Sequence, residues 1–415
     1  NLGAREARGE YLLLLNNDTE VVFPHWLERM LATAQQPGVG AVGARLLYPE
    51  IGRVQHAGIV LGMPGGMYSV ADHVFEDMDY LYPGYLNRSL TMQNYSAVTA
   101  ACLMVEKQIY EAVGGMDEEV FQVCFNDVDF CLKIQAGGLR NVYTPYAVLY
   151  HHHAKSIGRV TTDPRPALKA AVREREEMEA MLARWLPVMG NDPGFNRHLS
   201  LRTKRVAIES DRIVAWDAKL PGRKKVLGIP VPGGSGEYRL SQPLQVLQEK
   251  GKLDGEIHQP SAGIPTVVEL VRQGPDALLL HTGISDYIYE TMEAYRRYIP
   301  DLRIVFGLDD LVGGVPEKSS LYDHWSRHYP DAKQRLRRVL KLCDAAVVST
   351  QPLADLIQKM VGEVAVVPNR LRRSIWGDLK SERRVGDKPR VGWVGAGQHR
   401  GDLELIHEVI RATHK

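Results

Sequence analysis

The sequence predicts an α/β protein made of two consecutive domains. Short apolar runs that suit strands alternate with helical segments along most of the chain, which is the pattern of α/β folds. A chain of 415 residues is also longer than one ordinary domain. Its hydrophobic content of 44% and charged content of 24% are typical of globular proteins that bury substantial cores.

The first domain is predicted to span residues 1–205. Its expected strands are apolar and rich in β-branched residues, and they cover 10–15, 39–47, 97–105 and 141–149. The helices expected among them cover 24–35, 107–113 and 126–135. Residues 52–94 show no clear period and are expected to form long functional loops. An amphipathic helix over 166–186 closes the domain; we expect its apolar face to pack on that domain, with a membrane surface as the alternative.

Residues 206–222 are polar and weakly patterned, and we interpret them as a linker. Strand and helix signals resume over 223–388 and predict an open, doubly wound parallel sheet. Its expected strands cover 226–231, 277–281, 303–306, 345–349 and 364–367. Residues 389–415 begin another such unit, so we expect the chain to be truncated at this end. Its turn, Gly395-Ala396-Gly397, is not a dinucleotide fingerprint, because Arg400 stands where the third glycine is required.

Charge and cysteine content exclude several classes of protein. The chain has 51 Lys and Arg against 50 Asp and Glu, and this balance argues against a nucleic-acid partner. Four irregularly spaced cysteines indicate neither a zinc site nor a disulfide framework, and free thiols suit the cytoplasm. No apolar run reaches the length of a membrane span. We therefore expect a cytoplasmic location, with peripheral association at the inner face of the plasma membrane left open.

A polar sequence, Asn16-Asn17-Asp18, directly follows the first expected strand. A carboxylate just beyond the carboxyl end of a buried parallel strand lies where α/β folds bind ligands. A divalent metal that bridges a diphosphate prefers such a hard oxygen ligand. The structural alternative is that Asp18 only caps the helix that follows.

Two acids, Asp127 and Asp129, lie in the first turn of the helix expected over 126–135. Acids at a helix N-terminus are favoured by the helix dipole, so electrostatic capping is the structural alternative to a catalytic role.

Three consecutive histidines, His151-His152-His153, come directly after the last expected strand of the first domain. Their position after an apolar strand favours a role in ligand binding, and a solvent-exposed run is the alternative. Ser156 and Arg159 follow, and an arginine can donate two hydrogen bonds to phosphate oxygens.

Together, these three clusters resemble the large family of GT-A glycosyltransferases that build bacterial surface polysaccharides. We assign residues 1 to about 205 to this resemblance, and the matching segments agree with the family in order, spacing and flanking residues. They are residues 7–11, 15–21, 96–102, 113–118, 125–129 and 150–152.

The resemblance implies roles for individual residues. Asp18 stands at the last position of the metal-binding DXD-type motif, and His151 would be the second protein ligand of a Mn²⁺ or Mg²⁺ ion. Asp127 stands at the position of the catalytic base. The residues expected at the nucleotide sugar are Asn16, Asn17, Thr99, Ala100, Ala101, Ser156 and Arg159. Those expected on the acceptor side or around the base are Asn126, Asp129 and His152.

The chain also departs from the family pattern. Asn126 stands where Glu is common, so the base lacks an acidic neighbour that would raise its pKa. Ala100 stands where Gly is frequent beside the donor sugar, and His153 replaces a frequent Glu. The family's first βαβ portion, which holds the nucleotide base, would precede Asn1, so we expect the domain to lack it here.

The second domain resembles the N-terminal half of a GT-B glycosyltransferase. The resemblance rests on the glycine-rich segment 232–236 and on residues 344–350 and 366–369. A glycine-rich turn after a first strand can present backbone N–H groups to phosphate or sugar oxygens, so the expected contacts are Gly233, Gly234, Ser235 and Gly236.

The function that follows is inverting, metal-dependent transfer of a sugar from a nucleotide-diphospho-sugar to a glycan or lipid-linked glycan acceptor in surface polysaccharide synthesis. Inversion requires one carboxylate to take the proton of the acceptor hydroxyl, and a metal would neutralise the leaving diphosphate. We expect a bifunctional enzyme. The main alternative is a non-catalytic GT-A module attached to a GT-B enzyme. A nucleotidyltransferase also places acids after strands, but the Asp127 helix followed by the histidine strand fits that class poorly.

Overall fold

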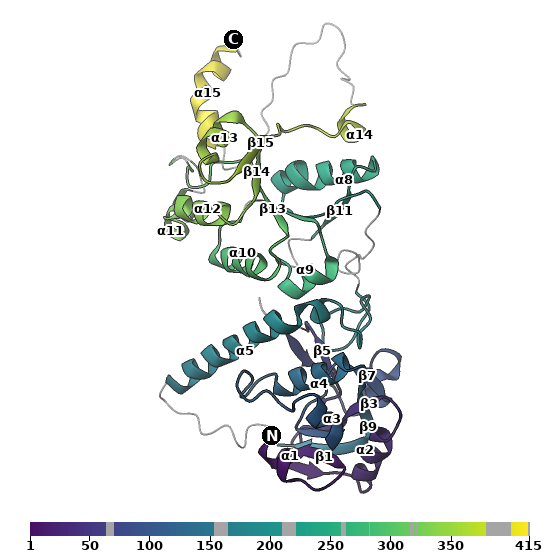
Figure 1. Ribbon diagram of the computed structural model, residues 1–415. Coiled ribbons are helices and arrows are strands. Elements are labelled where there is room, and N and C mark those ends of the chain that lie inside the picture. Colours follow the sequence, from purple (N-terminus) through teal and green to yellow (C-terminus); the bar gives the residue numbers. More distant parts are fainter. Residues whose placement is uncertain are drawn as a thin grey trace. The chain divides into compact units, whose positions relative to one another are not determined.

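The computed structural model describes residues 1–63, 70–152, 165–209, 221–258, 263–281, 283–315, 317, 319, 322–378 and 400–413 (Figure 1). Contacts among Cα atoms divide the chain into two compact units. The first unit contains Asn1–Ala218 and Pro265–Gly274, and the second contains Lys219–Ile264 and Pro275–Lys415. Within the described ranges, no helix is long and apolar enough to cross a membrane.

The first unit is built on a seven-stranded mixed sheet with the order β1-β8-β3-β9-β2, to which β4 and β7 pair at β3 and β9. These strands are β1 (Tyr11–Leu15), β2 (Thr19–Val21), β3 (Val39–Leu47), β4 (Val54–His56), β7 (Gln93–Tyr95), β8 (Cys102–Glu106) and β9 (Arg140–His151). β3 and β9 run parallel, and the other pairs are antiparallel. All nine residues of β3 are buried, as expected for a central strand that is apolar on both faces.

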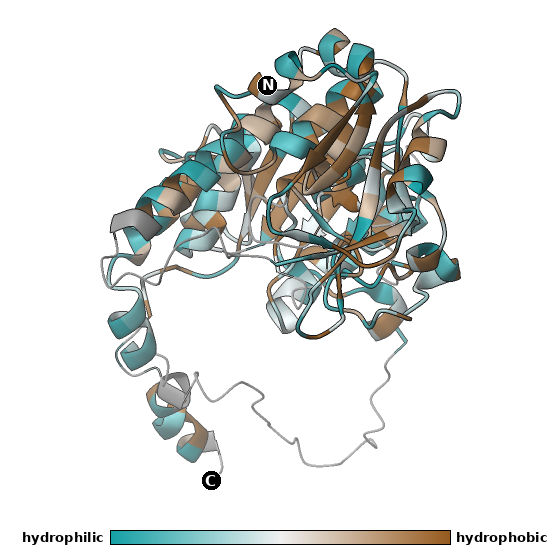
Figure 2. Ribbon diagram, turned by 90° about the horizontal axis from the view of Figure 1, so that it is seen from below, coloured by the Kyte–Doolittle hydropathy of each residue, from teal (hydrophilic) through white to brown (hydrophobic). Residues whose placement is uncertain are grey.

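Side chains alternate along β3, so each face of the sheet receives its own cover. Helix α2 (Trp26–Ala34) packs through Met30 and Ala34 into a cluster with Val42, Ala44 and Leu46. On the opposite face Val98 lies against Gly43, where an added Cβ would come within 2.5 Å of the valine. Figure 2 shows the matching distribution of hydropathy, with hydrophobic residues gathered in the strands and hydrophilic residues on the outer faces of the helices.

The remaining helices of this unit are α1 (Leu2–Glu6), α3 (Lys107–Ala112), α4 (Asn126–Ala136), α5 (Arg165–Gly190) and α9 (Val267–Gln273). The helices expected over 24–35, 107–113 and 126–135 are thus confirmed. The strand expected over 97–105 is wrong in its first half, because β8 begins only at Cys102 and residues 99–101 form a turn that lines a pocket. Residues 52–94 contain short strands among their loops, including β5 (Ile59–Leu61) and β6 (Ala71–His73).

Helix α5 includes the amphipathic segment predicted over 166–186. Its C-terminal half packs within the first unit through buried Met181, Leu182 and Leu186. Its N-terminal half does not, since Leu168 and Val172 are 67% and 50% exposed. The predicted packing of this helix on its own domain is therefore confirmed only for the half that also contacts α9.

The second unit is an all-parallel sheet of six strands in the order β11-β10-β12-β13-β14-β15. The strands are β10 (Lys225–Ile229), β11 (Asp254–Ile257), β12 (Ala277–His281), β13 (Arg303–Leu308), β14 (Ala345–Val348) and β15 (Glu363–Val366). Its helices are α7 (Gly234–Gly236), η2 (Glu237–Ser241), α8 (Gln242–Glu249), α10 (Asp286–Tyr298), α11 (Tyr322–His328), α12 (Ala332–Leu340), α13 (Gln351–Ile357), α14 (Arg373–Trp376) and α15 (Arg400–Thr413).

The predicted parallel sheet is confirmed, and among the described strands of the second unit the sequence missed only β11. That strand contains Asp254, Gly255 and Glu256, so it has no apolar run that would indicate a strand. The strand and glycine turn predicted over 390–397 lie outside the described residues.

Candidate active site

A pocket of about 630 Å³ lies in the first unit beside the carboxyl ends of β1 and β9. It brings together many of the residues singled out in the sequence: Asn16, Thr99, Ala100, Ala101, Asn126, Asp127 and His151. Other residues complete its wall: Leu14, Leu15, Leu46, Tyr48, Gln55, Asp72, His73, Glu76, Met116 and Val123. The antiparallel pairing of Leu15 with Cys102 explains the convergence, because it places residues 99–101 next to the polar end of β1.

Asp18 and His151 meet at the rim of this pocket. Strand pairing aligns Thr19 with His151, and the backbone N–H of His152 donates to the carbonyl of Asp18 at 2.9 Å. As a result, Oδ1 of Asp18 lies 3.1 Å from Nε2 of His151. The side-chain amide of Asn16 also reaches Nε2 of His151, at 3.2 Å.

Gln55 fixes the tautomer of His151. Its Oε1 lies 2.7 Å from Nδ1 of His151, and its Nε2 lies 3.5 Å from the carbonyl of the same residue. With the amide in this orientation, Nδ1 carries the proton and Nε2 presents a lone pair towards the carboxylate of Asp18. A lone pair and a carboxylate oxygen that face each other are stabilised by a positive charge between them, which either a proton on Nε2 or a metal ion can supply.

The pair fits two ligands of a divalent cation. Two ligands about 2.1 Å from a metal on adjacent octahedral corners are about 3 Å apart, close to the observed 3.1 Å between Asp18 and His151. The hydrogen bond from His151 to Gln55 is the kind that orients metal-binding histidines. Among the described residues, no group of three or more His, Cys, Asp or Glu could hold a metal, so a cation here would need further ligands from its substrate.

Asp127 lies in the first turn of α4, after Phe125, whose φ of 59° is left-handed. Its Oδ2 accepts a hydrogen bond from the N–H of Ala100 at 3.1 Å, and its Oδ1 accepts one from Val128 at 2.9 Å. Asn126 Oδ1 accepts from the N–H of Asp127 at 2.7 Å. The carboxylate is thus held in place by two backbone donors and keeps further lone pairs towards the pocket it lines.

Asp129 does not join Asp127 in the pocket. It is 0% exposed, and its Oδ1 accepts hydrogen bonds from Arg184 at 2.8 Å and from the indole of Trp185 at 2.9 Å. Its Oδ2 lies 3.3 Å from the ammonium of Lys133. Asp129 therefore joins α4 to α5, because two residues along a helix turn a side chain by about 200°.

The other predicted residues have mixed positions. His152 points to Glu20, with 3.1 Å between Nε2 and Oε2, and it does not line the pocket. Asn17 does not line the pocket either. His153, Ser156 and Arg159 lie outside the described residues.

Sequence reasoning missed a polar network on one wall of the pocket. Lys204 pairs with Asp72 at 2.8 Å and also with Glu76, which accepts a hydrogen bond from the hydroxyl of Tyr48 at 2.7 Å. Burial raises the pKa of Glu76, but the hydrogen bonds from Lys204 and Tyr48 outweigh it and leave that pKa below its usual value. These residues belong to no motif; the aperiodic character of residues 52–94 was a signal for Asp72 and Glu76, and Tyr48 and Lys204 had none.

In the second unit, the glycine-rich segment follows β10 and begins a helix at Gly234. A Cβ on Gly236 would come within 2.0 Å of the carbonyl oxygen of Val231, so the turn requires glycine there. The hydroxyl of Ser235 donates to Oδ2 of Asp309, whose Oδ1 lies 3.3 Å from Nε2 of His281. These three side chains meet at the carboxyl ends of neighbouring parallel strands.

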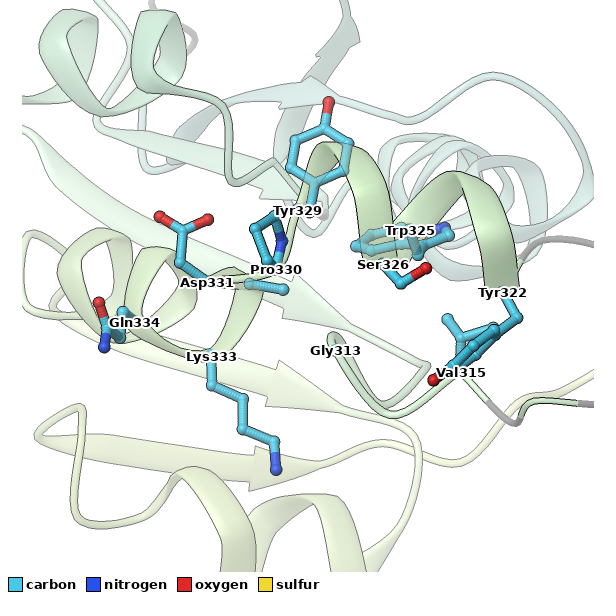
Figure 3. Close-up of a pocket in the computed structure, with 11 residues that line it drawn as sticks. Gly313, Val315, Tyr322, Trp325, Ser326, Tyr329, Pro330, Asp331, Lys333 and Gln334 are labelled. Carbon is cyan, nitrogen blue, oxygen red and sulfur yellow. The ribbon is translucent and has the colours of Figure 1, made fainter.

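Another pocket of the second unit lies beside α11 and α12, and it is lined by aromatic rings such as Trp325 and Tyr329 (Figure 3). Its only acid, Asp331, is paired with Arg335 at 2.8 Å. This pocket lacks the convergent acids and histidines of the pocket around Asp127.

Comparison with known proteins supports the interpretation of the first unit. Residues 1–113 match the sequence profile of the family described as glycosyl transferase family 2. Over 216 residues the chain is 44% identical to uncharacterized protein y4gI of Sinorhizobium fredii, which covers 51% of this chain and 22% of the relative. Over 202 residues it is 40% identical to the O-antigen biosynthesis protein RfbC of Myxococcus xanthus, covering 48% of this chain and 15% of the relative.

A shorter match of 73 residues, 37% identical, relates the chain to the N-acetylglucosaminyl-diphospho-decaprenol L-rhamnosyltransferase of Mycobacterium tuberculosis; it covers 18% of this chain and 22% of that protein. The crystal structure of GalNAc-T7 with UDP, GalNAc and Mn²⁺ aligns with a TM-score of 0.29 and 14% identity, over 36% of this chain and 29% of that one. The chain thus spans about a fifth of the length of these curated relatives. Residues 1–113 carry a glycosyl transferase family 2 domain, so the first unit contains glycosyltransferase sequence.

Proposed function

We propose that the first unit performs inverting, metal-dependent transfer of a sugar from a nucleotide-diphospho-sugar to a glycan acceptor. The observation that carries this proposal is the meeting of two groups around one pocket. Asp18 and His151 lie 3.1 Å apart in an arrangement that suits two ligands of one cation, and Asp127 offers a fixed carboxylate in the same pocket.

In this reaction Asp127 accepts the proton of the acceptor hydroxyl. The acceptor oxygen then attacks the anomeric carbon of the donor sugar, and the bond from that carbon to the diphosphate oxygen breaks on the opposite side. The two backbone N–H groups that bind Asp127 hold its carboxylate in place for this transfer. General-base catalysis by a positioned carboxylate contributes about 10²–10⁴-fold. A divalent cation held by Asp18 and His151 would supply positive charge to the leaving diphosphate.

The charge of the pocket supports the need for a cation. Among the described residues, its wall and rim contain the acids Asp18, Asp72, Glu76 and Asp127, against the ammonium of Lys204, which pairs with Asp72. A diphosphate would be repelled from this surface unless a cation accompanied it. We therefore propose that nucleotide and metal bind together.

The acceptor class is proposed from the printed names of two relatives, an O-antigen biosynthesis protein and a rhamnosyltransferase whose named substrate is a diphospho-decaprenol. The rhamnosyltransferase name favours a lipid-linked glycan acceptor, and the O-antigen name favours a polysaccharide as the product. Such an acceptor would bring the protein to the inner face of the plasma membrane during turnover.

Calorimetry with UDP tests the proposal, with and without Mn²⁺. The first unit is expected to bind UDP only with the metal, and Asp18→Asn is expected to weaken this metal-dependent binding at least about tenfold, as the charge of a metal ligand is lost. Glu20→Gln, two residues further along the chain and paired with His152, is the matched control. Equal UDP binding in excess chelator would contradict the metal site and favour a non-catalytic module.

For the second unit we propose a nucleotide-sugar-handling role of the GT-B type, which would make the protein bifunctional. Two observations support it: β11 and β12 flank β10, so the strand order reverses beside the glycine-rich segment, and Ser235, His281 and Asp309 meet there. The test is UDP binding in the Asp18→Asn background. Ser235→Val is expected to lower the binding that remains, and no remaining binding would argue against this role.

A further inference from the structure

The pocket of the first unit contains a pair of histidines that the proposed reaction does not use. His56 ends β4 and His73 ends β6, and their Nδ1 atoms lie 2.9 Å apart. The ring planes are nearly perpendicular, at 81°. His56 is completely buried, and His73 lines the pocket.

The hydrogen bonds of the pair determine where each proton lies. The backbone N–H of Thr99 can only donate, and it donates to Nε2 of His56 at 3.4 Å. A neutral His56 therefore carries its proton on Nδ1 and donates it to Nδ1 of His73. His73 accepts at Nδ1, so its own proton is on Nε2.

An additional proton on either ring would disrupt the hydrogen bonds that connect Thr99, His56 and His73. A charged His56 would turn an N–H towards the N–H of Thr99, and a charged His73 would place two N–H groups face to face. Burial, and then the nearby rings of His73 and His151, lower the pKa of His56. Burial also lowers the pKa of His73, with Asp127 the leading opposing charge. Burial and the hydrogen bonds thus favour the neutral form of the pair, which has one arrangement of protons.

One N–H donor of the histidine pair, on Nε2 of His73, remains for a ligand. Among the described residues, Nε2 of His73 has no hydrogen-bond partner, and its ring lines the pocket that contains Asp127. The neighbouring Asp72 and Glu76 are acceptors. A phosphate or carboxylate beside His73 would be repelled by these acids, whereas a hydroxyl can accept from His73 and donate to a carboxylate.

We propose that His73 is a specificity-determining residue that donates a hydrogen bond from Nε2 to a hydroxyl oxygen of the acceptor sugar. His56 is a positioning residue: it fixes the donor direction of His73, and it holds Thr99, whose neighbour Ala100 binds Asp127. The assignment to the acceptor follows from Asp127, which takes the acceptor proton, so this inference rests on the proposed function.

The protonation pattern is tested by NMR on the full chain with ¹⁵N-labelled histidine. His56 is expected to be protonated on Nδ1, the less common tautomer of free histidine, and His73 on Nε2. Both should stay neutral from about pH 8 to about pH 6, across the usual histidine pKa of about 6.5. Exposed His328 is the internal reference in the same spectra. Titration of either buried ring in that range, or the reverse pair of tautomers, would overturn the proposal.

The ligand is tested with His73→Asn, whose Oδ1 can still accept from His56 but which has no donor at the position of Nε2. The probes are methyl N-acetyl-β-glucosaminide and methyl α-rhamnoside, followed by NMR titration. If the wild type binds one of these glycosides, His73→Asn is expected to bind it roughly 2- to 10-fold more weakly. This is the effect of losing one neutral hydrogen bond. The variant's binding of UDP with Mn²⁺ should be unchanged.

UDP binding with Mn²⁺ and glycoside binding together distinguish a failure of the proposed function from a failure of the role of His73. Loss of metal-dependent UDP binding in the wild type would count against the proposed function itself. If UDP and Mn²⁺ bind but the wild type binds neither glycoside, or both proteins bind a glycoside equally, only the role of His73 is refuted. Unchanged thermal unfolding of His73→Asn confirms that the comparison is between folded proteins.

Discussion

Asp127 and Asp129 are two residues apart on α4, yet their surroundings give them different roles. Asp127 faces the pocket and binds only backbone N–H groups, so its carboxylate can accept a proton from a substrate. Asp129 is buried against Arg184, Trp185 and Lys133, so its charge is used within the fold. The contacts of Asp129 with Arg184 and Trp185 cannot be read from the sequence around it, because these two residues lie on another helix.

The substitution Asp127→Asn keeps the shape of the side chain and removes its basicity. With a matched donor and acceptor, turnover is expected to fall about 10²–10⁴-fold, or roughly 3–5 kcal/mol in activation free energy. Donor binding should hardly change, since the proposed site holds the metal and diphosphate through Asp18 and His151. Steady-state kinetics together with UDP calorimetry measure both effects.

Asp129→Asn is the control for that substitution. It weakens a buried charged contact and is expected to lower the free energy of unfolding by about 1–3 kcal/mol, while turnover per folded molecule stays near normal. A variant that melts like the wild type but has lost turnover would show that the base has been assigned to the wrong acid.

Gln55 is expected to support metal binding through its hydrogen bond to His151. Gln55→Met keeps the approximate volume but removes the acceptor that fixes the tautomer of His151. The loss of such a hydrogen bond is expected to weaken metal-dependent UDP binding about 10- to 100-fold. Titrating Mn²⁺ at constant UDP measures the change, and Gln93→Met, outside the pocket lining, is the control. Unchanged Mn²⁺ dependence would mean that His151 does not bind the metal.

At the scale of elements, α5 organises the start of the catalytic helix. The carboxylate of Glu177, which is 2% exposed, accepts hydrogen bonds from the backbone N–H groups of Gln122, Val123 and Cys124. These residues immediately precede α4 and its Asp127. Two contacts therefore connect α5 to the base: Glu177 holds the loop before α4, and Arg184 holds Asp129 within it.

Glu177→Gln leaves one oxygen for three donors and places an NH₂ group against backbone N–H. The free energy of unfolding is expected to fall by about 1–3 kcal/mol, and urea denaturation measures it. Glu176, the adjacent residue, is exposed, so Glu176→Gln should leave the free energy of unfolding within about 0.5 kcal/mol of the wild-type value. Equal effects of the two substitutions would show that the loop does not depend on this carboxylate.

At the scale of the whole molecule, the first unit is assembled from two separate stretches of chain. Helix α9 lies between β11 and β12 in the sequence, yet it clusters with the first unit and contacts α5. Arg202 pairs with Glu269 at 3.0 Å, and Arg272 donates to the carbonyl of Leu199 at 3.0 Å. Val271 lies against Gly190, where an added Cβ would come within 2.4 Å of the valine methyl.

Gly190→Ala tests this arrangement. The new methyl overlaps Val271 and is expected to destabilise the first unit by about 1–3 kcal/mol. Val271→Ala should restore part of the loss in the double variant, since contacting residues give non-additive effects. Gly3→Ala, with no atom within 4 Å of its added Cβ, is the control in thermal unfolding. Strictly additive effects at positions 190 and 271 would exclude the packing of α9 on α5.

The sequence by itself determined the local structure and the chemistry of its motifs. Apolar runs such as 11–15 and 277–281 are strands because their side chains can be buried only in a sheet, and the glycine and proline signals end the helices near the expected residues. The same local patterns indicated Asp18, Asp127 and His151. They failed where a strand is polar, as in β11, and where a chain turns to line a pocket, as at residues 99–101.

Only the tertiary structure decided which residues share the pocket and what each one faces. Gln55, His73 and Glu76 come from a segment without a motif, and strand pairing with β3 and β5 brings them beside residues more than fifty positions further along the chain. Lys204 reaches the same wall from beyond α5. Local sequence patterns record which side chains are buried and where helices end, but the partner of a buried polar group depends on contacts between distant segments, and those contacts are set by the packing of the whole unit.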